Sequence, residues 1–157
     1  MSTPTAPTVC EFTTADMDEA REFLDSVYGW RLTVHRHGNA GRPLVVSRTD
    51  AGAVSCAHAT APGDISYQVA GEDFVVIDTL SSGVFELEHD KSCDRYGPGD
   101  VYVANHPGAE FRSTTRDIEV LTTTLPSTLF AEVAGAAPDT LVEFSSYTPI
   151  AGAGRRW

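Results

Sequence analysis

The sequence predicts a mainly β fold: an antiparallel barrel of short strands with one helix before it and one after it. Three observations support this prediction. From Leu32 to about Leu125, apolar and polar residues alternate with a period of two, which places them on opposite faces of strands. Clusters of Gly, Pro, Asn and Asp interrupt the alternation at short intervals, as in sandwiches and barrels. At both ends of this region the apolar spacing becomes helical.

Residues 1–10 are rich in Thr and Pro and are predicted to form a flexible arm. A helix follows the arm. Asp16 can cap its first turn, Glu19 stands where a capping box requires an acidic residue, and Gly29 ends it. One face of this helix is expected to pack on the barrel, because its apolar residues recur at helical spacing: Met17, Ala20, Phe23, Leu24, Val27 and Tyr28.

Two Pro-Gly corners are the sharpest turn signals in the strand region. Pro98-Gly99 and Pro107-Gly108 bracket the alternating segment Val101–Asn105, and each pair favours a tight change of direction. The other predicted strands are Leu32–His37, Leu44–Thr49, Val54–Ala59, Ile65–Val69, Phe74–Leu80, Val84–Glu88, Glu110–Ser113 and Ile118–Leu125.

A second helix is predicted after Pro126. Leu129, Phe130 and Val133 recur at helical spacing, and Gly135 ends the run. An apolar stripe on a helix must be buried somewhere. The sequence leaves two places for it, the core of the chain or a contact between two copies.

Composition indicates one domain in a reducing compartment. A chain of 157 residues with 41% apolar residues is long enough for one core. No apolar run has the length of a membrane span, and the N-terminus has no leader-like segment. Its three cysteines, Cys10, Cys56 and Cys93, are odd in number and widely spaced, which disfavours a disulfide framework. We therefore expect a cytoplasmic protein.

The net charge of −11 bears on possible partners. Phosphate backbones repel a chain this acidic, so these residues are not expected to bind nucleic acid by themselves. Lys91 is the only lysine among the 11 basic residues. A membrane surface is not expected as a partner either.

In the order and spacing of several segments, the sequence resembles the N-terminal, cupin-like sensor domain (the AraC-binding-like domain) of AraC/XylS-type transcription regulators. The likeness covers roughly residues 10–150 and includes a helix before the barrel. The segments that carry it are Thr13 to Leu24, Tyr28-Gly29, Leu80 to Gly83 with Phe85 and Leu87, Gly97-Pro98-Gly99-Asp100, the run from Leu121 to Leu129-Phe130, and Val142–Tyr147.

The resemblance implies a cupin-like antiparallel β-barrel (a double-stranded β-helix), a homodimer and a regulatory small-molecule effector or arm. It implies residues 1–10 as the arm, 11–147 as the sensor and dimerisation domain, and 148–157 as a linker towards a DNA-binding domain. In this family two C-terminal helix-turn-helix units contact DNA, and the sequence contains neither. The chain is then either a part of such a regulator or a stand-alone sensor. The helix with Leu129, Phe130 and Val133 is the candidate dimer contact.

The chain lacks part of the metal-binding pattern of cupins. His35 and His37 form an H-x-H pair on one strand face, but no glutamate follows closely. After the second Pro-Gly corner there is Glu110 where metal-binding cupins carry a histidine. We therefore expect no metal, no cofactor and no enzymatic activity. Two alternatives remain: a metal-dependent cupin enzyme, supported by the H-x-H pair, and a stand-alone interaction protein that blocks a regulator by mixed dimerisation.

Asp78 is the most informative candidate for ligand binding. It alternates with Phe74, Val76 and Leu80, so one carboxylate shares a strand face with three apolar side chains. A buried carboxylate needs a partner, either a structural arginine such as Arg48 or a ligand. For each aromatic candidate, plain core packing is the interpretation that the sequence favours over ligand contact. The full set expected to line the barrel is Trp30, Arg48, His58, Tyr67, Phe74, Asp78, Phe85 and Tyr102.

Overall fold

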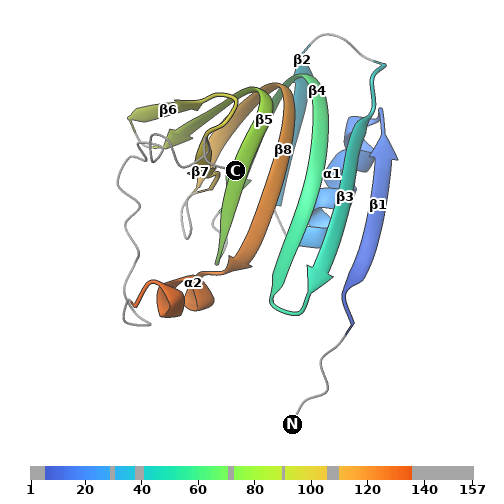
Figure 1. Ribbon diagram of the computed structural model, residues 1–157. Coiled ribbons are helices and arrows are strands. Elements are labelled where there is room, and N and C mark those ends of the chain that lie inside the picture. Colours follow the sequence, from blue (N-terminus) through green and yellow to red (C-terminus); the bar gives the residue numbers. More distant parts are fainter. Residues whose placement is uncertain are drawn as a thin grey trace.

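The computed structural model describes residues 6–28, 31–37, 41–70, 73–89, 91–105 and 110–135 of the chain. Figure 1 shows a curved sheet with two short helices. In chain order the elements are β1 (Thr8–Thr14), α1 (Met17–Tyr28), β2 (Arg31–His37), β3 (Leu44–Ala51), β4 (Val54–Ala70), β5 (Phe74–His89), β6 (Ser92–Tyr96), β7 (Val101–Val103), β8 (Phe111–Pro126) and α2 (Ser127–Val133).

All the strand pairs are antiparallel and form one eight-stranded sheet in the order β1-β3-β4-β8-β5-β6. The long strands β4, β8 and β5 lie side by side at its centre (Figure 1). β2 pairs with the second half of β4, and β7 pairs with the first half of β5. β4 and β5 therefore have different outer neighbours along their two halves, whereas β8 lies between β4 and β5 along its whole length.

The three long strands bend at the same level of the sheet. The pairing register shifts between Ala61 and Asp64 in β4 and between Leu80 and Val84 in β5. Gly63, Gly83 and Asp117 have positive φ at these bends, and the Gly63 amide donates to the Asp117 carboxylate at 2.8 Å. Bulges of this kind increase bending and twist. The bends allow both halves of the sheet to enclose one interior.

The predicted fold class is confirmed, but the strand boundaries differ. Three pairs of predicted short strands are in fact the single strands β4, β5 and β8. β1 and β6 are strands that the sequence analysis did not predict. Thr8 to Cys10, expected in the flexible arm, pair with Asp50, Thr49 and Arg48 of β3. Residues 1–5 and 148–157 lie outside the described residues.

The first helix begins as predicted, with a different partner for Glu19. The Asp16 carboxylate accepts hydrogen bonds from the amides of Asp18 at 2.8 Å and Glu19 at 3.2 Å, which makes it the N-cap. Glu19 accepts a 2.6 Å hydrogen bond from the Thr14 hydroxyl, and Thr14 in turn accepts from the Asp16 amide. β1 and α1 are thereby joined at a fixed corner.

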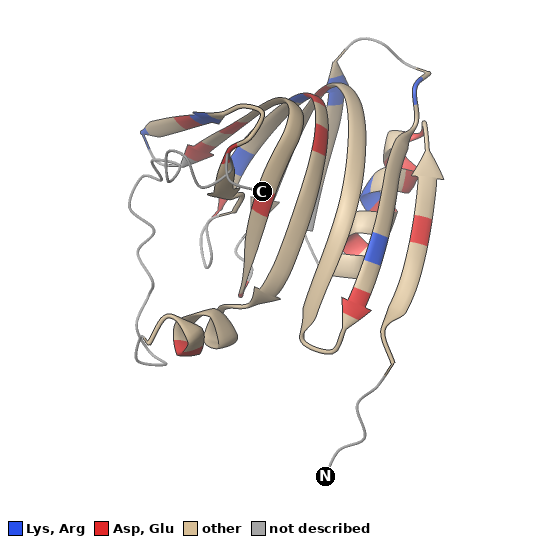
Figure 2. Ribbon diagram, in the orientation of Figure 1, with Lys and Arg blue, Asp and Glu red and all other residues tan. Residues whose placement is uncertain are grey.

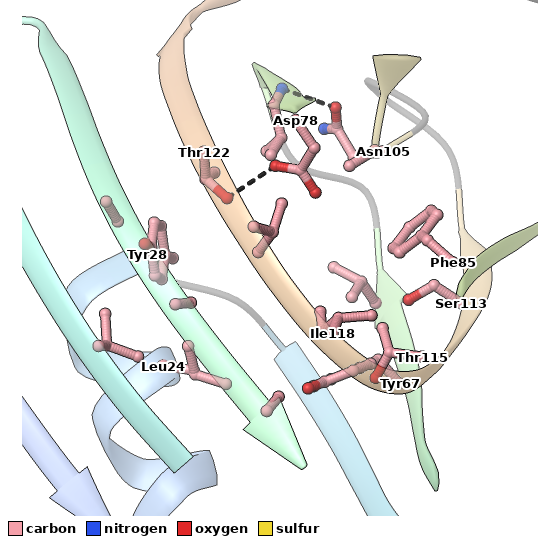
Figure 3. Close-up of a pocket in the computed structure, with 18 of the residues that line it drawn as sticks. Leu24, Tyr28, Tyr67, Asp78, Phe85, Asn105, Ser113, Thr115, Ile118 and Thr122 are labelled. Atoms are coloured by element: carbon pink, nitrogen blue, oxygen red, sulfur yellow. Dashed lines mark hydrogen bonds between the residues drawn. The ribbon is translucent and has the colours of Figure 1, made fainter. Parts of the chain in front are cut away.

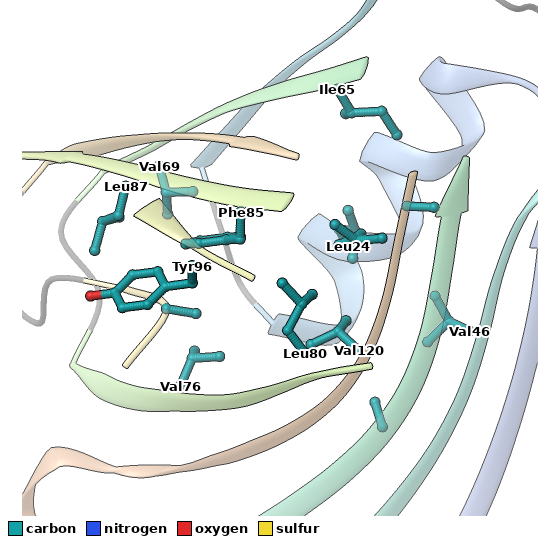
Figure 4. Close-up of a cluster of buried hydrophobic side chains, with 14 of the residues drawn as sticks. Leu24, Val46, Ile65, Val69, Val76, Leu80, Phe85, Leu87, Tyr96 and Val120 are labelled. Carbon is teal, nitrogen blue, oxygen red and sulfur yellow. The ribbon is translucent and has the colours of Figure 1, made fainter. Parts of the chain in front are cut away.

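The hydrophobic core lies inside the folded sheet, where α1 contributes Ala20 and Leu24 (Figure 4). Ile65 and Leu80 are among its largest fully buried side chains. Aromatic rings gather at the β6 and β7 side of the core. The rings of Tyr96 and Tyr102 stack with centroids 4.1 Å apart, and Phe85 lies 4.9 Å from Tyr102. This packing fixes the short strand β7 against β5.

The first Pro-Gly corner docks on β5 as a turn. The Gly99 amide donates to the Leu80 carbonyl at 2.8 Å, and the Leu80 amide donates to the Asp100 carbonyl at 3.1 Å. Asp100 also accepts from the Gly97 amide through its side chain. The second corner, Pro107-Gly108, lies outside the described residues.

Candidate ligand-binding site

A mostly apolar cavity of about 120 Å³ lies between the two halves of the sheet (Figure 3). Its walls come from β3, β4, β5 and β8, and α1 contributes Leu24 and Tyr28. A cavity of about 150 Å³ can hold a benzene-sized molecule, so this one suits a ligand of similar or slightly smaller size. The polar groups that line it are Tyr28, Tyr67, Asp78, Asn105, Ser113, Thr115 and Thr122.

Asp78 is the only acidic residue among the described lining residues of this cavity. It is 6% exposed, and its Oδ1 accepts a 2.7 Å hydrogen bond from the Thr122 hydroxyl, its direct partner in the β5–β8 pair. Burial raises the pKa of Asp78 to about 7, against smaller lowering effects from Thr122 and Tyr102. The Tyr102 hydroxyl lies near the carboxylate without making a hydrogen bond of good geometry.

Arg48 does not pair with Asp78, so the suggested structural partner was wrong. The Arg48 Nε donates to both carboxylate oxygens of Asp50 at 3.0 Å. Its guanidinium carbon lies 4.4 Å from the ring centroid of Tyr28. Arg48 and Asp50 share one face of β3, which makes this local pair easy to form. Among the described residues, the ion pairs of Arg and His involve other acids, and none reaches Asp78.

A second cavity, of about 270 Å³, adjoins the first at Tyr28. Arg48, Asp50 and Phe74 line it, together with the end of β8. Burial raises the pKa of Tyr28, an effect that Arg48 partly opposes, so its hydroxyl stays protonated at neutral pH. Tyr28 thus borders both an inner, mostly apolar cavity and an outer cavity of mixed polarity.

Asn105 is a polar residue of the inner cavity that the sequence analysis did not single out. Its side-chain oxygen accepts from the Val76 amide at 2.9 Å, and its amide nitrogen donates to the Phe74 carbonyl at 2.8 Å. The side chain continues the β7–β5 pairing beyond the end of β7 (Figure 3). In the sequence, Asn105 could have been found as a lone asparagine after an apolar strand and just before a Pro-Gly corner.

The predicted lining residues divide into five groups. Tyr67, Asp78 and Phe85 line the inner cavity, whereas Arg48 and Phe74 line the outer one. Tyr102 is buried against Phe85 and does not line either cavity. His58 was placed in the barrel wrongly: its side chain is 51% exposed and contacts Glu119 at 2.9 Å, because Ala57 and Ala59 take the inward positions of β4. Trp30 lies outside the described residues.

His35 and His37 lie on β2 with exposed side chains. Within the described segments, no three His, Cys, Asp or Glu residues come together as a possible metal site. Figure 2 shows basic residues spaced among acidic ones, and several form ion pairs, including Arg95 with Glu86 and Arg116 with Asp64. None of the described helices is long and apolar enough to span a membrane.

Comparison with known proteins gives a fold likeness. No family model matches the sequence, and no curated protein matches it. The AraC-like transcriptional activator CuxR is similar in structure, with a TM-score of 0.63 and 17% identity over 80% of this chain and 51% of CuxR. Weaker likenesses include the Cnp3 cupin domain of Schizosaccharomyces pombe (TM-score 0.42, 11% identity, 68% and 73% of the two chains). Another is KdgF from a Halomonas species, with a TM-score of 0.40 and 19% identity over 52% of this chain and 80% of KdgF.

This chain therefore spans about half the length of the CuxR chain. Identity is low, and the likeness concerns the fold. The bent antiparallel sheet, the cavity between its two halves and the match over most of this chain agree with one another. The chain has the cupin-like barrel fold, which it shares with the matched part of an AraC-like transcriptional activator.

Proposed function

We propose that this chain is a non-enzymatic regulatory domain that senses a small molecule in its inner cavity. The observation that carries the proposal is the cavity itself, an apolar space with one buried carboxylate, inside a fold shared with a transcriptional activator. Binding sites for small molecules are mostly apolar and have a few placed polar groups. The ligand would favour one arrangement of the domain by binding it more tightly than the alternative.

The effect of ligand binding would be transmitted through α1. α1 supplies Leu24 and Tyr28 to the inner cavity, and Arg48 of β3, which Asp50 holds in place, contacts the Tyr28 ring. A ligand that displaces Tyr28 would move the end of α1. DNA contact, if the domain serves a regulator, belongs to another region, because these residues carry a net charge of −11.

A metal-dependent enzyme is the competing proposal, and its support is the pair His35 and His37. Neither histidine lines the inner cavity, and β2 places both on an exposed surface. A catalytic metal needs three protein ligands in most sites. Elemental analysis of protein purified without chelator separates the proposals. Stoichiometric metal that disappears in His35→Ala would favour the enzyme.

Filling the cavity should abolish ligand binding without unfolding the protein. Ala57 lines the inner cavity and is buried, so Ala57→Leu adds three carbons to the empty space. We expect the melting temperature to stay level or rise, while compounds that raise it in the wild type have no effect. A thermal-shift screen measures both quantities.

Ala51→Leu is the matched control, because Ala51 is exposed at the end of β3. It should respond to ligands like the wild type. Compounds that stabilise Ala57→Leu as well as the wild type would place the site elsewhere. A diverse library without any stabilising compound would count against ligand sensing.

We also propose that the domain forms a homodimer through α2. The helix contacts β5 and β8, which partly covers Leu129 and Phe130, but Val133 is 80% exposed. An exposed valine beside two half-buried apolar residues suits a contact between copies.

Val133→Asp is therefore expected to weaken a dimer at least about tenfold, because it places an unpaired charge in an apolar contact. Thr128→Asp is the control on the same helix, since Thr128 is exposed and lies on another side of it. Sedimentation of both variants measures the effect. A monomeric wild type at high concentration, or equal effects of both variants, would contradict the α2 dimer.

A further inference from the structure

The inner cavity joins an apolar wall to a carboxylate for which the described part of the chain supplies no countercharge. Among the described residues, Thr122 is the one hydrogen-bond donor of good geometry to Asp78, and it is neutral. The nearest basic side chain in the neighbouring cavity, Arg48, is held by Asp50. Buried carboxylates are normally paired, because an uncompensated charge in an apolar surrounding is costly.

Three ligand classes can be compared at this site. A second anion would be repelled by Asp78, and a purely apolar molecule would leave the carboxylate uncompensated. A cation would form a charge-assisted hydrogen bond with it, the stronger kind in a water-poor cavity. The apolar remainder of such a ligand would contact Val76, Phe85 and Val120 on the same walls.

We infer that the inner cavity selects a small organic cation, an alkylamine whose ammonium group binds Asp78 and whose apolar body fills the remaining space. This inference rests on the proposed function, since it assigns a ligand class to the same cavity. The volume is slightly below that of a cavity that holds benzene, and it limits the ligand to about six non-hydrogen atoms.

The geometry fits an ammonium group in a second respect. Thr122 binds Oδ1 and so fixes the orientation of the carboxylate, and Figure 3 shows the other oxygen directed away from Thr122. Two aromatic rings lie nearby. Phe85 lines the cavity, and the ring centroid of Tyr102 lies 4.9 Å from that of Phe85. Aromatic faces attract cations, most strongly where water is excluded.

Binding of an amine should depend on pH through Asp78. The titratable groups that interact with it are Tyr102 on β7 and Tyr28 on α1, while β8 offers the neutral Thr122. Arg48 on β3 lies on the other side of Tyr28, in the outer cavity. Burial keeps both tyrosines protonated, and Arg48 stays charged beside Asp50. Asp78 is therefore the group expected to change its charge near pH 7. Its protonation should weaken amine binding about tenfold from pH 8 to pH 6.

Isothermal titration with two probes of equal size tests the inference on the 157-residue chain. Isopentylamine carries the ammonium group, and isopentanol replaces it with a hydroxyl. At pH 8 we expect the amine to bind at least about tenfold more tightly than the alcohol. Asp78→Asn should abolish this difference and the pH dependence, and should still bind the alcohol. The matched control is Asp64→Asn, because Asp64 is a strand carboxylate that pairs with Arg116 at the surface.

The outcomes separate the ligand class from the proposed function. Equal binding of both probes, or tighter binding of the alcohol, would overturn the cation and leave a ligand-binding cavity. Amine binding that persists in Asp78→Asn would overturn the role of Asp78. Binding of neither probe would overturn this ligand class, and the screen with Ala57→Leu would then decide the proposed function by itself.

Discussion

Asp78→Asn should make the stability of the folded protein less dependent on pH than that of the wild type. The pKa of Asp78 is about 7 in the folded protein against 3.8 for the free side chain. Between these values the folded chain holds a proton that the unfolded chain releases, so the free energy of unfolding falls as pH rises through this interval. Above pH 7 Asp78 no longer lowers the free energy of unfolding further, because its carboxyl group is then ionised in both the folded and the unfolded protein.

Asparagine keeps the size of the side chain and cannot ionise. The free energy of unfolding of Asp78→Asn, relative to wild type, should therefore rise by roughly 3 kcal/mol from pH 5 to pH 8. Urea unfolding at the two pH values measures this difference, and other titrating groups cancel in the comparison. Asp64→Asn should show no such rise, because Asp64 is exposed beside Arg116. A relative stability that falls with pH would mean that Asp78 has a cationic partner.

The role of Asp78 could be partly predicted from the sequence, and its partner could not. Its alternation with apolar residues indicated a buried carboxylate, and its position in the cavity agrees. Arg48 was a plausible partner because it stands on an apolar strand. Pairing with Asp50, two residues away on the same face, needs no long-range register. Asp78 instead meets Thr122 through the β5–β8 register, which the strand pattern does not contain.

His58 shows how the choice of strand face limits such predictions. Both faces of β4 here offer small or polar residues, so Ala57, His58 and Ala59 give no strong period-two signal. The cavity requires small side chains on the inner face, and the alanines take it. A polar residue could then be placed only on the outer face, where His58 contacts Glu119.

Turn signals were correctly located and wrongly interpreted. Pro62-Gly63-Asp64 and Ser81-Ser82-Gly83 were expected to separate strands, yet β4 and β5 continue through both. A glycine with positive φ serves a chain reversal and a β-bulge equally well. The difference depends on which strand lies alongside, and here β8 accompanies both strands through the bend. The composition therefore indicated the fold class, while strand number and length required the long-range pairing.

Gly83→Ala is expected to be among the most destabilising single changes at these bends. Gly83 has φ of 83°, and a Cβ there would lie 2.5 Å from the Asp117 carbonyl oxygen and 2.7 Å from its carbonyl carbon. The Arg116 carbonyl oxygen would be closer still. These are backbone atoms of β8, so the clash can be relieved only by opening the bend between the two strands. We expect a loss of about 4 kcal/mol or more in the free energy of unfolding.

Gly52→Ala is the matched control, because Gly52 has a similar φ of 70° and a Cβ there would meet no heavy atom within 4 Å. This substitution carries the backbone strain alone, about 1 to 2 kcal/mol. Urea unfolding of the two variants isolates the close approach of β5 and β8 as the difference between them. Equal losses would mean that the bend relaxes freely. A much larger loss for Gly83→Ala would mean that β5 and β8 are held together at the bend too firmly to move apart for a methyl group.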